Sequence, residues 1–121
     1  MISGLGKTGE KLAIKFLIVN KFKIIKHNYS CPLGEIDIIA NHNDILYFIE
    51  VKTRSSDQYG GPFAAVDYKK QQKISRIAAY YLMTERYLGD AQYGVIGIIY
   101  NSYTKRYKVD FLANAFEHAL N

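Results

Sequence analysis

Four charged residues stand inside two strongly apolar segments of this sequence. Glu35 and Asp37 lie in the first segment, and Glu50 and Lys52 lie in the second. A buried charge without a partner is costly, so this pattern requires a compensating group. Carboxylates bind hard divalent cations, and a neighbouring ammonium can orient a water molecule or stabilise charge on a phosphate. The four residue types therefore indicate a Mg²⁺ or Mn²⁺ site suited to metal-assisted hydrolysis of a phosphodiester bond.

The two apolar segments flank a polar turn at residues 41–44, which predicts a β-hairpin over residues 34–54. Side chains alternate between the faces of a strand, so only an odd sum of paired residue numbers separates the acids from the isoleucines. We expect the hairpin to close around residues 42 and 43, which pairs Glu35 with Glu50. One face would then be core, with Ile36, Ile38, Tyr47, Ile49 and Val51. The other face would carry Glu35, Asp37, Glu50 and Lys52.

Electrostatics favours a bound cation on the charged face. Two carboxylates about 5 Å apart repel each other by about 3 kcal/mol at an effective dielectric constant near 20. A whole domain is stable by only about 5–15 kcal/mol. Three acids and one lysine leave a formal charge near −2, which one divalent cation would cancel. The alternative is a surface hairpin with ordinary cross-strand pairs between glutamate and lysine.

The remaining pattern predicts a single α/β domain over residues 1–121, with helices around a mixed sheet. Asp67 is a good N-cap for the second helix, and the glycine-containing segment over residues 55–62 indicates a loop. The expected order is a helix over 3–20, a strand over 22–29, the hairpin, a helix over 67–88, strands over 93–101 and 106–111, and a helix over 112–120.

Composition favours a polyanionic partner. The chain has 121 residues, a formal net charge of +5 and a pI near 9.2. Its single cysteine, the absence of a signal peptide and the lack of an apolar run of about 20 residues predict a cytoplasmic protein that does not enter a membrane. Basic residues gather on the second helix and after Lys52, where they would contact nucleic acid: Lys69, Lys70, Lys73, Arg76 and Arg54. The alternative for the four on the helix is a solvated helix face.

Several short motifs together resemble the YraN-like family of small bacterial proteins, which belongs to the restriction-endonuclease-like PD-(D/E)xK nuclease superfamily. The matching segments are Gly6-Lys7-Thr8-Gly9-Glu10, Gly34-Glu35-Ile36-Asp37, Phe48 to Arg54, Val66 with Lys70-Gln71, and Asn114-Ala115-Phe116. The resemblance covers almost the whole chain. It implies a restriction-endonuclease-like core, in which a mixed β-sheet is flanked by helices.

The resemblance also implies a role for each matching residue. Asp37 and Glu50 would be metal-binding carboxylates, and Lys52 would be the catalytic lysine. Glu10 would be the additional helical acid that resolvase-like members of the superfamily bring to the metal. Gln71 would reach from the second helix towards the metal or the phosphate.

Two further positions qualify this comparison. Glu35 would be another ligand or a group that supports the ligands. Relatives tend to carry an aspartate where this chain has Gly94. That difference leaves open whether the strand that contains residue 94 contributes to the site.

The sequence thus predicts a Mg²⁺- or Mn²⁺-dependent endonuclease that cleaves DNA, including branched or structured DNA. Cleavage of both strands of a duplex would favour a homodimer. Two alternatives stay open. The same fold can bind nucleic acid without cleaving it, or serve as a protein-interaction factor through its tyrosine-rich surface.

Overall fold

The computed structural model describes residues 2–55 and 66–118, and for residues 2–7 it describes the backbone alone. Most of the loop predicted over residues 55–62 lies outside the described residues. The elements follow in the order α1 (Ile2–Val19), β1 (Lys23–Cys31), β2 (Gly34–His42), β3 (Ile45–Ser55), α2 (Tyr68–Thr84), β4 (Asp90–Asn101) and β5 (Arg106–Phe116). Within the described part of the chain, no helix is both long enough and apolar enough to span a membrane.

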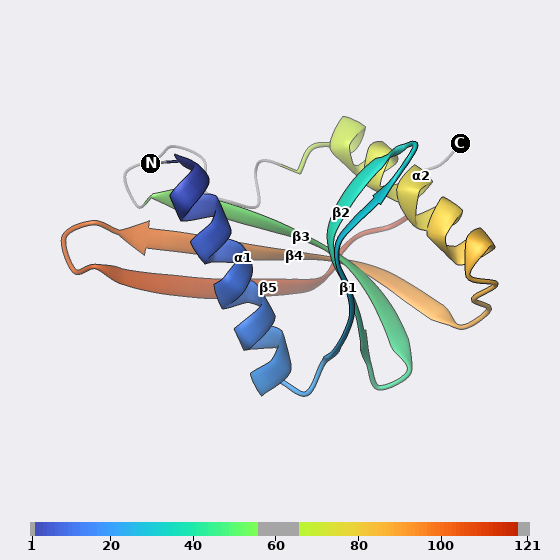
Figure 1. Cartoon of the computed structure of the whole chain (residues 1–121), viewed down its shortest axis with the longest axis horizontal. Helices are drawn as coiled ribbons and strands as arrows, with labels where there is room; N and C mark the ends of the chain where they lie inside the picture. The colour runs from blue at the N-terminus through green and yellow to red at the C-terminus, as the bar shows by residue number, and fades with distance from the viewer. Residues whose placement is uncertain (1, 56–65, 119–121) are drawn as a thin grey trace.

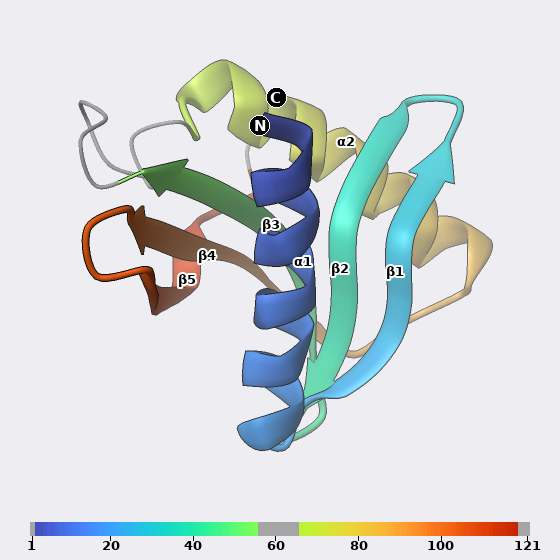
Figure 2. The ribbon, with the colours of Figure 1, turned by 60° about the vertical axis from the view of Figure 1, so that its left-hand side comes forward.

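The described strands form one five-stranded sheet in the order β1-β2-β3-β4-β5. β3 and β4 are parallel because α2 connects them, and the other neighbouring strands are antiparallel. Figures 1 and 2 show α1 across one side of the strongly twisted sheet and α2 across the other. The predicted mixed α/β architecture is therefore confirmed.

Each helix covers its own part of the core. On the α1 side, Leu17 packs in a cluster with Ile38 and Ile49, all fully buried. On the α2 side, Ile74 and Ile77 pack in a cluster with Phe48. β2 and β3 contribute residues to both clusters, so this hairpin is the centre of the sheet and has little freedom to move.

The hairpin closes one residue later than predicted. Asn43 and Asp44 both have positive φ, 52° and 65°, as in the tight two-residue turns that suit the twist of a hairpin. Ile38 therefore pairs with Ile49 and Ile39 pairs with Phe48, so paired numbers sum to 87. The odd sum is confirmed, but the expected sum of 85 is wrong. Asn43 and Asp44 form the turn because they tolerate a left-handed backbone. The predicted sum of 85 rests on the middle of the polar segment, which does not indicate this preference.

The expected alternation also breaks at Asp37. Ile36 packs with the α2-side cluster, whereas Ile38 packs with the α1-side cluster. The prediction that both isoleucines share one face is therefore wrong. The break coincides with the end of the β2–β3 ladder at the pair of Ile38 and Ile49, where β2 bends away from β3 (Figure 1).

The second helix begins as predicted and ends earlier. Asp67 is the N-cap, and its side chain accepts a hydrogen bond from the Lys70 backbone N–H at 2.9 Å. The helix stops at Thr84 because Arg86 adopts positive φ and the next backbone N–H donates back to the Leu82 carbonyl. Leu88, expected on the apolar face of the helix, is almost completely exposed.

The helix predicted over residues 112–120 is wrong for its described part, because β5 continues to Phe116. The ring of Phe116 stacks on Tyr93 of β4, with centroids 4.7 Å apart and an interplanar angle of 11°. Leu112 pairs with Val95, so the ladder holds this segment as a strand. Pairing with the neighbouring strand outweighs the helical propensity of this alanine-containing segment.

Candidate active site

The two central carboxylates meet where β2 and β3 diverge. The pairing of Ile38 with Ile49 would place Asp37 beside Glu50 if the ladder continued. Instead, the Asp37 side chain takes the place of a backbone acceptor: the Val51 N–H donates to its Oδ2 at 2.8 Å. A backbone bond from the neighbouring strand therefore fixes Asp37 next to Glu50, and the end of the ladder leaves space between them.

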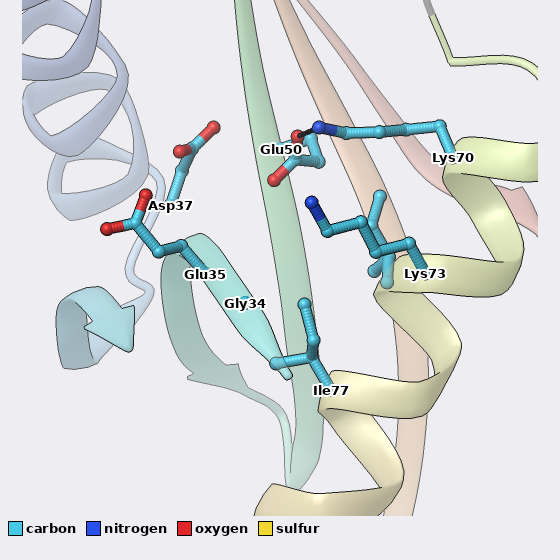
Figure 3. A pocket seen from close by; sticks show the side chains of 8 residues that line it. Gly34, Glu35, Asp37, Glu50, Lys70, Lys73 and Ile77 are labelled. Carbon is cyan, nitrogen blue, oxygen red and sulfur yellow. Dashed lines mark ion pairs between the residues drawn. The ribbon is translucent and has the colours of Figure 1, made fainter. Parts of the chain in front are cut away.

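Glu50 is a buried acid with a partner on α2. Only 4% of its surface is exposed, and its Oε2 lies 3.4 Å from the Lys70 Nζ. Figure 3 shows Lys70 reaching from α2 to this carboxylate. The Asp67 cap fixes the first turn of α2. This turn therefore places the Lys70 ammonium beside Glu50, the most buried acid of the site.

Gly34 allows α2 to approach the acids closely. Its φ is +141°, a region that side chains disfavour, and a Cβ at this position would lie 2.9 Å from Ile77 Cδ1 and 3.1 Å from Lys73 Cε. Lys73 therefore crosses the start of β2 and directs its ammonium into the space beside Glu50 (Figure 3). The result is a hollow of about 230 Å³, lined by Gly34, Glu35, Asp37, Glu50, Lys70, Lys73, Ile74 and Ile77.

Burial raises the pKa of both acids, and the negative charge of Asp37 raises the pKa of Glu50 further. Burial raises the pKa of Asp37 most, and the Val51 N–H and the ammoniums of Lys52 and Lys70 lower it by less. Burial also raises the pKa of Glu50, followed by the negative charge of Asp37, against the ammoniums of Lys70 and Lys52. Two such carboxylates in one hollow are typical of catalytic and metal-binding sites.

The charge count differs from the one expected from the hairpin alone. The three acids Glu35, Asp37 and Glu50 are matched by Lys52 and by two lysines from α2, Lys70 and Lys73. The formal sum is therefore zero rather than −2. Sequence spacing within the hairpin does not reveal the two helical lysines, because α2 lies some 20 residues further along the chain.

The predicted basic stripe lines a second hollow that adjoins the first. This hollow has a volume of about 520 Å³ and is lined by Lys52, Asp67, Lys69, Lys70, Lys73 and Arg76. Lys70 and Lys73 belong to both hollows. The acids and the cations therefore form one continuous surface, which includes Lys52.

Three other predicted site residues have different surroundings. The Gln71 side chain donates to the Val66 carbonyl at 3.2 Å, and Arg54 donates to the Thr53 carbonyl at 3.1 Å.

Glu10 is half-buried on α1. Its neighbour Gly9 packs so tightly on Thr53 that a Cβ would overlap Thr53 Oγ1. That contact holds this turn of α1 beside β3, one residue beyond Lys52.

A divalent ion could bind here between the buried carboxylate of Glu50 and the half-buried carboxylate of Asp37. Within the described part of the chain, no three aspartate, glutamate, histidine or cysteine side chains are grouped closely enough to hold a metal. Glu10 as a third ligand therefore stays a prediction. Mg²⁺ commonly binds through one or two carboxylates and completes its shell with water and substrate phosphate, so Asp37 and Glu50 fit this ion.

Gly94 lies on the opposite side of the sheet from the acids. It pairs with Ile49, and a Cβ at this position would meet the Phe111 ring at 2.8 Å on the α1 side. A larger residue here would disturb the core around Phe111. The difference at residue 94 therefore leaves the hollow that contains the acids unaffected.

The fold and the hollow define an α/β protein in which a five-stranded mixed sheet and two described helices surround a carboxylate pair among lysines. The chain belongs to the uncharacterised protein family UPF0102, which matches residues 9–113. It is 41% identical to a UPF0102 protein of Thermodesulfovibrio yellowstonii, over 93% of this chain and 95% of the relative. The UPF0102 proteins of Clostridium acetobutylicum and Alkaliphilus oremlandii are 41% and 43% identical, over 93% of this chain and 93% and 97% of the relatives.

Proposed function

We propose that this protein is a metal-dependent nuclease with a restriction-endonuclease-like core, which hydrolyses phosphodiester bonds of DNA. One observation carries the proposal: buried Glu50 and half-buried Asp37 form a carboxylate pair, both with raised pKa, directly beside a row of lysines. The carboxylate pair can bind a divalent cation, and the lysines can bind the phosphates beside that cation.

The residues of the site divide the chemistry between them. Asp37 and Glu50 would hold Mg²⁺ or Mn²⁺, and such an ion supplies Lewis-acid activation of the phosphate and of the attacking water. Lys52 lies close enough to lower the pKa of both carboxyls. Its ammonium would orient the attacking water and stabilise charge on the phosphate.

The neutral charge sum is compatible with catalysis. A divalent ion brings +2, while a phosphodiester and an attacking hydroxide together bring −2. The site would therefore stay balanced when ion and substrate enter together. An ion alone would leave an excess of positive charge, so we expect weak metal binding in the absence of nucleic acid.

The Lys70–Glu50 ion pair supports a second candidate function. This ion pair compensates the charge of the buried Glu50 carboxylate without a metal ion. A module that binds nucleic acid but does not cleave it would require such compensation. Such a module would use the lysines of the second hollow and retain the acids as a structural network.

A panel of substrates separates the two functions. The protein is incubated with Mg²⁺ or Mn²⁺ and single-stranded, duplex, flap and four-way-junction DNA, with the Lys52→Ala variant in parallel. A nuclease cleaves at least one substrate, and the variant loses most of the rate. Binding without cleavage under every condition would favour the module instead.

A further inference from the structure

The face of the sheet that carries Glu50 extends beyond the carboxylate pair. Along β3, Lys52 and Arg54 follow Glu50 at intervals of two residues and therefore share its face. Their partners on β4 are Gly97 and Ile99. The cations thus continue from the acids along the sheet, away from α2.

β5 adds two more cations to the same face. Lys108 pairs with Ile99, and Arg106 pairs with Asn101. Val109, which follows Lys108, packs with the α1-side cluster, so Lys108 and Arg106, one and three residues before it, point to the opposite side of the sheet. We call Lys52, Arg54, Arg106 and Lys108 the basic sheet face.

The cations of β5 are available to a partner. Arg106 is exposed, and the Lys108 side chain is 73% exposed. Asp110 lies 3.8 Å from Lys108, a loose surface pair that contributes little. Figures 1 and 2 show the β4–β5 turn projecting beyond α1, so this edge of the sheet extends away from the helices.

The length of the basic sheet face suits a nucleic acid. Asn101, the partner of Arg106, lies six residues beyond Val95, which pairs with Glu50. At about 3.3 Å per residue this distance is roughly 20 Å. Phosphates along one strand of duplex DNA are spaced by about 3.4 Å along the axis, so roughly six base pairs would cover it.

We propose that the basic sheet face binds the phosphate backbone of a nucleic-acid strand and guides it from the carboxylate pair to the β4–β5 turn. This proposal rests on the proposed function, because it assigns the path of the same substrate. At the turn, the 94% exposed Tyr103 stands where a base at the end of the bound segment can stack on it.

Binding of labelled 20-base-pair duplex DNA, followed by fluorescence anisotropy in EDTA over a range of salt concentrations, tests this path without cleavage. The test variant is Arg106→Gln with Lys108→Gln. The control is Lys23→Gln with Lys26→Gln, which removes the same charge from exposed positions on β1 at the other edge of the sheet. Melting temperatures are compared first, and only folded variants are used.

Loss of two phosphate contacts should weaken binding roughly 10- to 50-fold at 0.1 M salt and reduce the salt slope by about 1.8, with the control near the parent. Equal affinities in the two double variants would overturn the path. The proposed path would also be overturned if the parent protein bound anionic lipid vesicles but did not bind nucleic acid. Specific loss of binding in a protein that never cleaves DNA would support the path and refute the nuclease, so the two proposals fail separately.

Discussion

Replacing Asp37 with asparagine should make the metal-free protein more stable at pH 8. The substitution removes the repulsion between Asp37 and Glu50, worth about 3 kcal/mol for charges roughly 5 Å apart at an effective dielectric constant near 20. It also removes the attraction of Lys52 and Lys70 and weakens the bond from the Val51 N–H, which together offset about half. We expect a gain of about 1–2 kcal/mol.

Thermal unfolding in EDTA measures this gain, with Glu35→Gln as the matched control. Glu35 is exposed and carries the same charge, so its neutralisation should change stability by less than about 0.5 kcal/mol. For a chain of this size, 1–2 kcal/mol corresponds to a rise in Tm of about 4–8 °C.

Addition of Mn²⁺ should then bring the parent close to the stability of the Asp37→Asn protein. At ten times its dissociation constant the ion adds about 1.4 kcal/mol to the parent and much less to Asp37→Asn. A destabilised Asp37→Asn protein, or an equal response of parent and variant to Mn²⁺, would refute the electrostatic account of the pair.

Three further outcomes follow from the same hollow. The raised pKa values of Asp37 and Glu50 mean that the folded chain binds more protons than the unfolded chain. Metal-free stability should therefore fall as the pH rises from the ordinary carboxyl pKa through the raised values, which urea unfolding at a series of pH values measures. A stability that rises over this window would contradict the shifts. Lys70→Gln should cost about 1–2 kcal/mol at pH 7, because it leaves buried Glu50 without its cation, whereas exposed Lys69→Gln should cost almost nothing in the same unfolding assay. Gly34→Ala should cost about 1–3 kcal/mol in thermal unfolding, because its positive φ and the close approach of α2 both oppose a Cβ, and an unchanged Tm would count against that contact.

The sequence predicted the features that arise from local chemistry. Asp67 caps α2, and the apolar pattern of the hairpin required an odd register, because both depend on residues close together in the chain. The predicted sum paired Glu50 with Glu35, however, and the observed sum of 87 brings Asp37 beside Glu50 instead. A mixed sheet with helices on both sides followed from the order of the elements.

The features that the sequence did not predict depend on contacts between distant segments. The bend at Asp37 arises where β2 leaves β3 and a Val51 N–H takes the carboxylate as its acceptor. Lys70 and Lys73 enter the hollow only because α2 packs over Gly34. Phe116 stays in a strand because Tyr93 offers a stacking partner on β4. None of these partners is adjacent in the chain, so propensity and spacing carry no signal for them.

The most direct measurement of the central claim is the rate of Mg²⁺-dependent cleavage of the best DNA substrate by the parent, Asp37→Asn and Lys52→Ala proteins, each shown to be folded by its melting curve. We predict cleavage by the parent that disappears in EDTA, and a loss of at least 100-fold in both variants. Cleavage at the parental rate by either folded variant, or cleavage that persists in EDTA, would contradict the assignment of Asp37, Glu50 and Lys52 as the catalytic site.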